Sequence, residues 1–286
     1  MDPNTEATRR FSGGSHEPLP PFLLLSHHRS GSNFLTDLLQ VNERIECVSE
    51  PLSMHTEFRC FDLEAWTAEE ADSDCLHPRL REAPGVEAFI RGLREWLYLP
   101  PAGTVRGAKE TLLFDKLSWW GSAFPSMRVI WLVRDPRAVV HSVLRCGLWR
   151  FWEYPERVTE FCRDYYDDST IAPASPAELT LWSWKVRFAL ASEQLVHFDH
   201  LRVRLEDLVE RPSEELRRVL DMVGVSVSPA QEAYLGRPVE ESRGGIFSTV
   251  RDRDDVVGGW RVGLGADARR YVEQTAAEEM AALGYE

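Results

Sequence analysis

The chain of 286 residues has no long hydrophobic run. A membrane-spanning helix needs roughly twenty consecutive apolar residues, and a secretory signal needs an apolar core near its start. The sequence shows neither pattern, and residues 1–19 have no hydrophobic period, so we expect them to form a mobile tail. These absences predict a cytoplasmic protein that does not bind a membrane.

Basic residues are also in deficit, with 33 Lys and Arg against 46 Asp and Glu and a net charge of −13. Proteins that bind nucleic acids normally need a surplus of Lys and Arg to displace counterions from the phosphates. The composition therefore disfavours a nucleic-acid partner. Any anionic ligand must be held by a local cluster of basic residues.

Cysteine is scarce and scattered. The five cysteines form no CxxC pair and follow no regular spacing. We therefore expect reduced thiols, and we expect no bound metal.

The chain does contain short apolar runs that alternate with helical patterns. The apolar runs cover residues 22–26, 46–49, 104–109, 128–133 and 201–205. The clearest helical patterns cover residues 87–97, 177–196, 213–223 and 266–283, with Ser213 as the N-cap of the third. This alternation predicts a three-layer α/β fold, in which helices cover both faces of a mainly parallel sheet of about five strands.

The composition predicts a single domain over residues 20–286. Residues 55–85 are rich in acidic, proline and aromatic residues without a clean period, and we interpret them as an insertion or a lid over a ligand. Residues 243–265 are rich in glycine and are expected to form a loop before the final helix.

The first apolar run leads through a short polar turn into a helical pattern, and the free N–H groups at such a helix start bind anions. In a nucleoside triphosphate loop, a glycine is followed by four residues and then by Gly-Lys-Ser/Thr. Here Ser26 stands at the first glycine and Gly31 at the second. Ser32 and Asn33 follow, so the lysine is missing, and Arg29 lies inside the loop instead. An arginine offers a planar fork to a phosphate or sulfate group, so the loop is expected to bind one. In the alternative, the turn is an ordinary strand-turn-helix connection and its arginine is only solvated.

A second strand-to-helix junction follows residues 128–133, at the same edge of the predicted sheet. Pro136 fixes the start of this helix. Arg134 lies just before the start and Ser142 about two turns into the helix, so both can contact one phosphate. In one alternative, Asp135 holds Mg²⁺ for phosphoryl transfer. In another, Arg134 and Asp135 only form an ion pair at the helix start.

Together the two motifs resemble the sulfotransferases that use 3′-phosphoadenosine 5′-phosphosulfate (PAPS), and most closely their carbohydrate-type branch. The first motif is Ser26-His27-His28-Arg29-Ser30-Gly31-Ser32-Asn33-Phe34. The second is Arg134-Asp135-Pro136-Arg137, continued to Ser142. In that branch an arginine replaces the loop lysine of the cytosolic enzymes, as Arg29 does in this chain. Weaker similarity extends through residues 107–109, 204–208 and 283–285.

The resemblance implies where the donor binds. The 5′-phosphosulfate would contact Arg29, Ser30, Gly31, Ser32, Asn33 and Phe34. The 3′-phosphate would contact Arg134 and Ser142. Arg251 and Arg253 loosely match the arginines of a donor-binding segment, which places the loop 243–265 near the donor. The resemblance also implies PAPS as the co-substrate, adenosine 3′,5′-bisphosphate as the product, and no metal.

Sulfuryl transfer needs a base for the acceptor proton and positive groups near the leaving oxygen. Glu50 ends the second predicted strand at the rim that carries the loop, and Pro51 predicts an extended backbone there. The Glu-Pro-Leu segment resembles the one with the candidate base in carbohydrate sulfotransferases, so we predict Glu50 as the base and His55 as the second choice. Lys109 is expected to neutralise sulfuryl or acceptor charge, and Arg29 to assist the leaving group. The alternatives are a solvated loop carboxylate and a surface lysine.

These observations predict a sulfotransferase that moves a sulfuryl group from PAPS to a hydroxyl of a small metabolite, free or glycosylated. Several of the ten tryptophans flank the predicted site and suit stacking on a small acceptor, while the net charge of −13 argues against a sulfated polysaccharide. The alternatives are a Mg²⁺-dependent small-molecule kinase of the same fold and a nucleotide-binding regulator without catalysis. The sequence does not indicate an oligomeric state.

Overall fold

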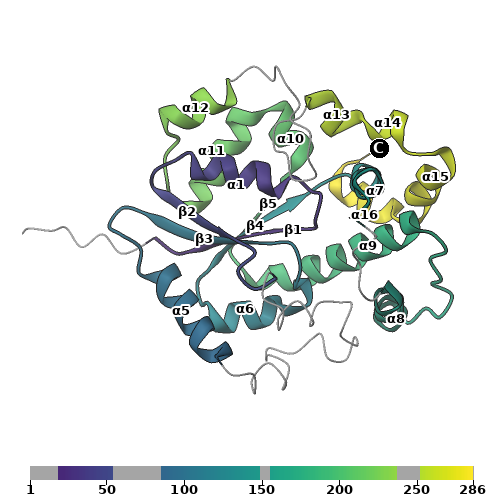
Figure 1. Ribbon diagram of the computed structural model, residues 1–286, viewed down its shortest axis with the longest axis horizontal. Coiled ribbons are helices and arrows are strands. Elements are labelled where there is room, and N and C mark those ends of the chain that lie inside the picture. The colour runs from purple at the N-terminus through teal and green to yellow at the C-terminus, as the bar shows by residue number, and fades with distance from the viewer. Residues whose placement is uncertain (1–18, 54–84, 149–154, 237–251, 286) are drawn as a thin grey trace, which may run out of the picture.

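Five parallel strands form one sheet in the order β2-β3-β1-β4-β5 (Figure 1). The strands are β1 Phe22–Ser26, β2 Ile45–Ser49, β3 Val105–Glu110, β4 Arg128–Val133 and β5 His200–Arg204. The computed structural model describes residues 19–53, 85–148, 155–236 and 252–285. The predicted parallel sheet is confirmed, and all five strands begin and end within one residue of their apolar runs.

Helices cover both faces of this sheet (Figure 1). One group consists of α1 Ser32–Gln40, α10 Leu205–Glu210, α11 Pro212–Val223 and α12 Pro229–Leu235. The other consists of α5 Val86–Tyr98, α6 Leu117–Ala123, α7 Pro136–Cys146, α8 Pro155–Tyr166 and α9 Pro176–Gln194, with the short 3₁₀ helices Phe114–Lys116 and Leu195–His197. Four more helices lie beside α7, namely α13 Arg253–Gly258, α14 Trp260–Gly263, α15 Ala266–Thr275 and α16 Ala277–Leu283.

The central strand β1 shows why the sheet is buried on both sides. Its residues Phe22 to Ser26 are all buried, as expected for a strand in the middle of a parallel sheet. Leu23 and Leu25 pack into the core beneath α5, α6 and α9, whereas Phe22 and Leu24 pack into the second core beneath α1 and α11. Because side chains alternate along a strand, an apolar run without alternation predicts two cores.

Three local expectations from the sequence are wrong. Helix α11 begins at Pro212 with Arg211 as its N-cap, not at Ser213, because a proline suits the first helical position, where no N–H is needed. The last helical pattern is split at Ala276, which is fully buried with φ of −111°. Where a loop over 243–265 was expected, the described part, 252–265, forms α13 and α14.

Candidate functional site

The carboxyl ends of the parallel strands bring the predicted site residues to one edge of the sheet. In the strand register, Leu25 of β1 lies beside Glu110 of β3, and Ser26 lies beside Leu132 of β4. Ser49 of β2 lies beside Lys109. Ligands of open parallel sheets bind at this edge, so the segments after β1, β2, β3 and β4 can contribute to one site.

The segment between β1 and α1 is a tight polar turn. Arg29 and Gly31 both have left-handed backbones, with φ of 66° and 88°, and the N–H of Ser30 donates to the carbonyl of His27 at 3.2 Å. A Cβ atom at Gly31 would lie only 2.6 Å from Cδ1 of Leu205, so a side chain there would be both strained and crowded. This turn leads directly into the N-terminus of α1, as the sequence predicts for an anion-binding loop.

Three buried hydroxyl groups lie in or next to this loop. The hydroxyls of Ser26, Ser30 and Thr36 form no hydrogen bond within the described part of the chain. Buried polar groups normally have a partner, and phosphate or sulfonate oxygens would supply acceptors for them. The residues present therefore fit an oxyanion ligand, and Ser26 and Thr36 were not among the predicted ligands.

Arg29 and Arg134 join the two sequence motifs into one site. Nε of Arg29 donates to the hydroxyl of Ser142 at 3.0 Å. The guanidinium of Arg134 donates to the carbonyl of Arg29 at 2.8 Å and to the carbonyl of Val256, in α13, at 2.5 Å. The structure thus brings together the residues that the sequence analysis assigned separately to the two ends of the donor.

The predicted base and the predicted lysine form an ion pair at the ends of β2 and β3. Nζ of Lys109 lies 2.5 Å from Oε1 of Glu50 and donates to Oδ1 of Asn33 at 3.1 Å. The hydroxyl of Thr111 donates to the same Glu50 oxygen at 3.3 Å. The Lys109 side chain is only 3% exposed, so it is not a surface lysine, whereas Glu50 is 26% exposed and remains accessible to an acceptor.

The backbone at Glu50 differs from the expectation based on Pro51. Its φ is 51°, which is left-handed rather than extended. The N–H of Glu50 donates to the carbonyl of Lys109 at 2.6 Å, so the backbone and the side chain of Glu50 are both attached to the same residue.

The sequence analysis missed a second carboxyl group, that of Glu110, beside this pair. The Glu110 side chain is fully buried, and Oε1 accepts hydrogen bonds from the backbone N–H groups of Leu52 at 2.8 Å and Ser53 at 3.4 Å. The Ser53 hydroxyl donates to the other carboxylate oxygen of Glu110, Oε2. Burial raises the pKa of Glu110 to about 7, and the charge of Glu50 acts in the same direction. The sequence offered one signal for this group, namely that Glu110 is a charged residue in a strand whose positions are mostly buried.

The back of the anion loop packs against α9 through His27, which was also missed. Nε2 of His27 lies 3.5 Å from the hydroxyl of Ser183, and the buried Arg187 donates to the Ser183 carbonyl at 3.3 Å and to its hydroxyl. Burial, aided by the charge of Arg187, lowers the pKa of His27 to about 3, and burial lowers the pKa of His28 as well. Both imidazoles are therefore neutral at pH 7.

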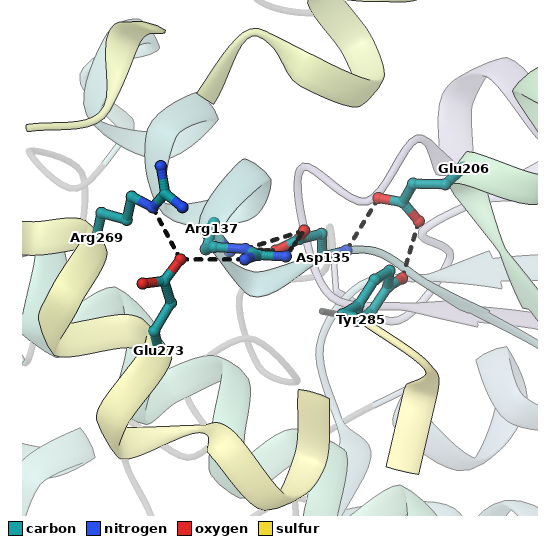
Figure 2. A network of polar contacts seen from close by, with 6 residues as sticks. All are labelled: Asp135, Arg137, Glu206, Arg269, Glu273 and Tyr285. Atoms are coloured by element: carbon teal, nitrogen blue, oxygen red, sulfur yellow. Dashed lines mark hydrogen bonds and ion pairs between the residues drawn. The ribbon is translucent and has the colours of Figure 1, made fainter. Parts of the chain in front are cut away.

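Asp135 is held inside a polar network at the start of α7 (Figure 2). Its carboxylate accepts from the N–H of Arg137 at 2.8 Å and from the Arg137 guanidinium at 2.8 to 3.1 Å. The same guanidinium donates to Glu273 of α15 at 3.1 Å. With both oxygens bonded to Arg137, Asp135 is a helix cap, and the interpretation of Asp135 as a metal ligand is not favoured.

The remaining predicted site residues are His55, Arg251 and Arg253. His55 and Arg251 lie outside the described residues. Arg253 begins α13 and is exposed, and the helix it begins contacts the site through the carbonyl of Val256.

A parallel sheet with a strand-turn-helix anion loop and a second basic strand-helix junction defines a phosphate-binding α/β protein. The family model described as the sulfotransferase family matches residues 20–229. The chain therefore belongs to the sulfotransferase family, as the two motifs predict.

The curated relatives agree with the predicted carbohydrate-type branch. Carbohydrate sulfotransferase 2 of Mus musculus is 36% identical over 90 residues, which are 30% of this chain and 17% of the relative. Carbohydrate sulfotransferase 7 of Mus musculus is 28% identical over 190 residues, which are 56% of this chain and 39% of the relative. The chain thus spans well under half the length of these relatives.

Solved structures show the same fold. A mouse sulfotransferase complexed with PAP superposes with a TM-score of 0.52 and 15% identity, covering 91% of this chain and 84% of that chain. The sulfotransferase domain of the Synechococcus PCC 7002 olefin synthase gives a TM-score of 0.50 and 18% identity, covering 92% and 97%.

The predicted cytoplasmic localisation is wrong. The curated relatives are carbohydrate sulfotransferases, which are Golgi membrane proteins. Among the helices that the structure describes, none is long and apolar enough to cross a bilayer.

Proposed function

We propose that this protein transfers a sulfuryl group from PAPS to a hydroxyl of a small acceptor, free or glycosylated. The observation that carries the proposal is the continuity of the site: Asn33, in the first turn of the loop helix, contacts Lys109, which holds the predicted base Glu50. A site for an oxyanion and a site for proton removal are therefore adjacent, as sulfuryl transfer to a hydroxyl requires.

The loop and the second junction would hold the donor. Residues proposed to contact the 5′-phosphosulfate are Arg29, Ser30, Gly31, Ser32, Asn33 and Phe34. Arg134 and Ser142 would contact the 3′-phosphate, and both are already linked to Arg29. Arg251 and Arg253 stay proposed as further phosphate contacts. When bound, PAPS supplies the transferable sulfuryl group.

Glu50 would take the proton of the acceptor hydroxyl. Its partly exposed carboxylate accepts from Lys109 and Thr111 through one oxygen, Oε1, and these two bonds fix its orientation. Lys109 also binds Asn33, so it keeps the base at a set distance from the loop. Arg29 would stabilise the negative charge that develops on the leaving oxygen. His55 stays the second choice for the base.

A small acceptor and the absence of a nucleic-acid partner are supported by the acidic net charge of −13, which repels polyanions. The carbohydrate sulfotransferase relatives support a hydroxyl on a sugar or a glycosylated molecule. A Mg²⁺-dependent kinase is not favoured, because the loop has no lysine and Arg137 occupies the carboxylate of Asp135.

Calorimetric titration tests the donor class. We expect adenosine 3′,5′-bisphosphate to bind more tightly than ADP or ATP with Mg²⁺, because only the first carries the 3′-phosphate. Tighter binding of ATP with Mg²⁺ would overturn the proposal. Turnover of PAPS with a panel of hydroxylated and glycosylated acceptors then separates an enzyme from a regulator that only binds the nucleotide.

A further inference from the structure

Two consecutive residues at the start of α10 contact the two segments proposed to bind the donor. The side chain of Leu205 packs against Gly31 so closely that a Cβ atom there would lie 2.6 Å from Cδ1. Oε1 of Glu206 accepts from the backbone N–H of Asp135 at 3.0 Å. This short segment therefore sets the spacing between the anion loop and the start of α7.

Tyr285 fixes the orientation of Glu206 (Figure 2). Its hydroxyl donates to Oε2 of Glu206 at 2.8 Å, and its ring lies against the guanidinium of Arg204, 4.3 Å from the ring centre. Glu206 and Tyr285 are both buried. Each carboxylate oxygen of Glu206 thus has one donor, and those donors come from segments that are 150 residues apart in the chain.

The N–H that Glu206 binds belongs to the peptide bond between Arg134 and Asp135. The carboxylate of Asp135 is held by Arg137, so the amide and the side chain of Asp135 are both fixed. Burial raises the pKa of Glu206, while the Asp135 N–H, the charge of Arg134 and the Tyr285 hydroxyl act in the opposite direction. The network therefore binds Glu206 as an acceptor on both of its oxygens.

We propose that Glu206 and Tyr285 are positioning residues for the 3′-phosphate of the donor. They hold the Asp135 peptide so that Arg134, before the helix, and Ser142, within it, face the same phosphate. This inference rests on the proposed function. Both residues would act through the Asp135 peptide and not by contact with the donor. Loss of either side chain should therefore weaken the binding of nucleotides that carry a 3′-phosphate and leave the binding of other nucleotides unchanged.

The test is Tyr285→Phe, which removes one hydroxyl and keeps the ring against Arg204. We expect adenosine 3′,5′-bisphosphate to bind about fivefold more weakly by titration calorimetry, the effect of one hydrogen bond of about 1 kcal/mol. Binding of adenosine 5′-monophosphate should not change. Tyr165→Phe is the matched control, because the Tyr165 hydroxyl donates to the carboxylate of Glu193 at 2.7 Å, between the C-terminal ends of α8 and α9.

Glu206→Gln supplies a second variant and a coupling measurement. If both residues act through the Asp135 peptide, the losses in the double variant with Tyr285→Phe will not be additive. Additive losses, equal weakening of both nucleotides, or unchanged bisphosphate binding would each overturn the inference. A wild-type protein that does not prefer the bisphosphate over the monophosphate would instead contradict the proposed function.

Discussion

The two halves of the site hold their cations in different ways. At the donor loop, Arg29 donates to a serine hydroxyl and Arg134 donates to two backbone carbonyls, all of them neutral acceptors. At the ends of β2 and β3, Lys109 instead lies 2.5 Å from the carboxylate of Glu50. The described hydrogen bonds of Arg29 and Arg134 go to uncharged groups, although the charges of Arg134 and the buried Glu206 also interact, whereas Lys109 is paired directly with a carboxylate. The proposed function places an anionic donor in the first half and a neutral hydroxyl in the second.

The largest expected effect is a loss of turnover from a change in the second half of the site, at Glu50. Glu50→Gln keeps an oxygen that can accept from Lys109 but removes the group that takes the proton. We expect the turnover rate at saturating PAPS to fall by about 10²- to 10⁴-fold, the usual contribution of a general base. Donor affinity should change little. The rate is measured by release of adenosine 3′,5′-bisphosphate.

Glu46→Gln is the matched control for that variant. Glu46 lies within β2, the strand that leads to Glu50, and pairs with Arg106 at 2.6 Å. Its turnover rate should equal that of the wild type. A Glu50→Gln enzyme with full activity would show that another group, such as His55, is the base.

The next largest effect is a loss of nucleotide affinity from a change in the first half of the site, at Arg134. Arg134→Ala removes the guanidinium proposed to bind the 3′-phosphate and to hold the Arg29 carbonyl. We expect affinity for adenosine 3′,5′-bisphosphate to fall by about 1.5 to 3 kcal/mol, the scale of a charged hydrogen bond. Arg134→Lys should recover only part of it, because an ammonium group cannot form the fork. Titration calorimetry measures both variants.

Arg128→Ala at the opposite end of β4 controls for the loss of a strand-end arginine. Arg128 donates to the carbonyl of Met222 at 2.7 Å and pairs with Asp199, away from the site. Its variant should bind the bisphosphate like the wild type. Unchanged affinity in Arg134→Ala would remove Arg134 from the donor site and leave it a structural role.

The parts of the site that the sequence predicts are those built from one continuous segment. The turn at Arg29 and Gly31 and the helix start at Pro136 follow from local patterns of strand, turn and helix, and the structure contains both. The curated relatives and the matched family model confirm the class of protein that these motifs indicate.

The parts that the sequence does not predict depend on distant partners. Glu110 binds a backbone N–H that is 58 residues away, His27 meets a serine 156 residues away, and Glu206 meets Tyr285 79 residues away. No local period encodes such pairs, because each of these residues is ordinary in its own segment. The burial of Lys109 has the same origin, since the strand pattern shows the lysine but not what packs around it.

The pH dependence of stability also compares the two halves of the site. The pKa of Glu110 is raised to about 7, so between pH 4.5 and 7 the folded protein keeps a proton that the unfolded chain releases. This group alone makes the free energy of unfolding fall as pH rises, by up to about 1.4 kcal/mol per pH unit. His27, with a pKa lowered to about 3, acts oppositely: below pH 6.5 the unfolded chain takes up a proton, so stability falls as pH falls.

Glu110→Gln mimics the protonated carboxyl and removes its contribution to the pH dependence of stability. The contribution of His27, which makes stability rise with pH, should remain. We expect the free energy of unfolding, measured by urea titration from pH 4.5 to 7, to rise with pH more steeply in this variant than in the wild type. The exposed Glu87→Gln should keep the wild-type slope. If Glu110→Gln and the wild type give parallel curves, the pKa of Glu110 is not raised in the folded protein, and its carboxylate is ionised beside Glu50 across this range.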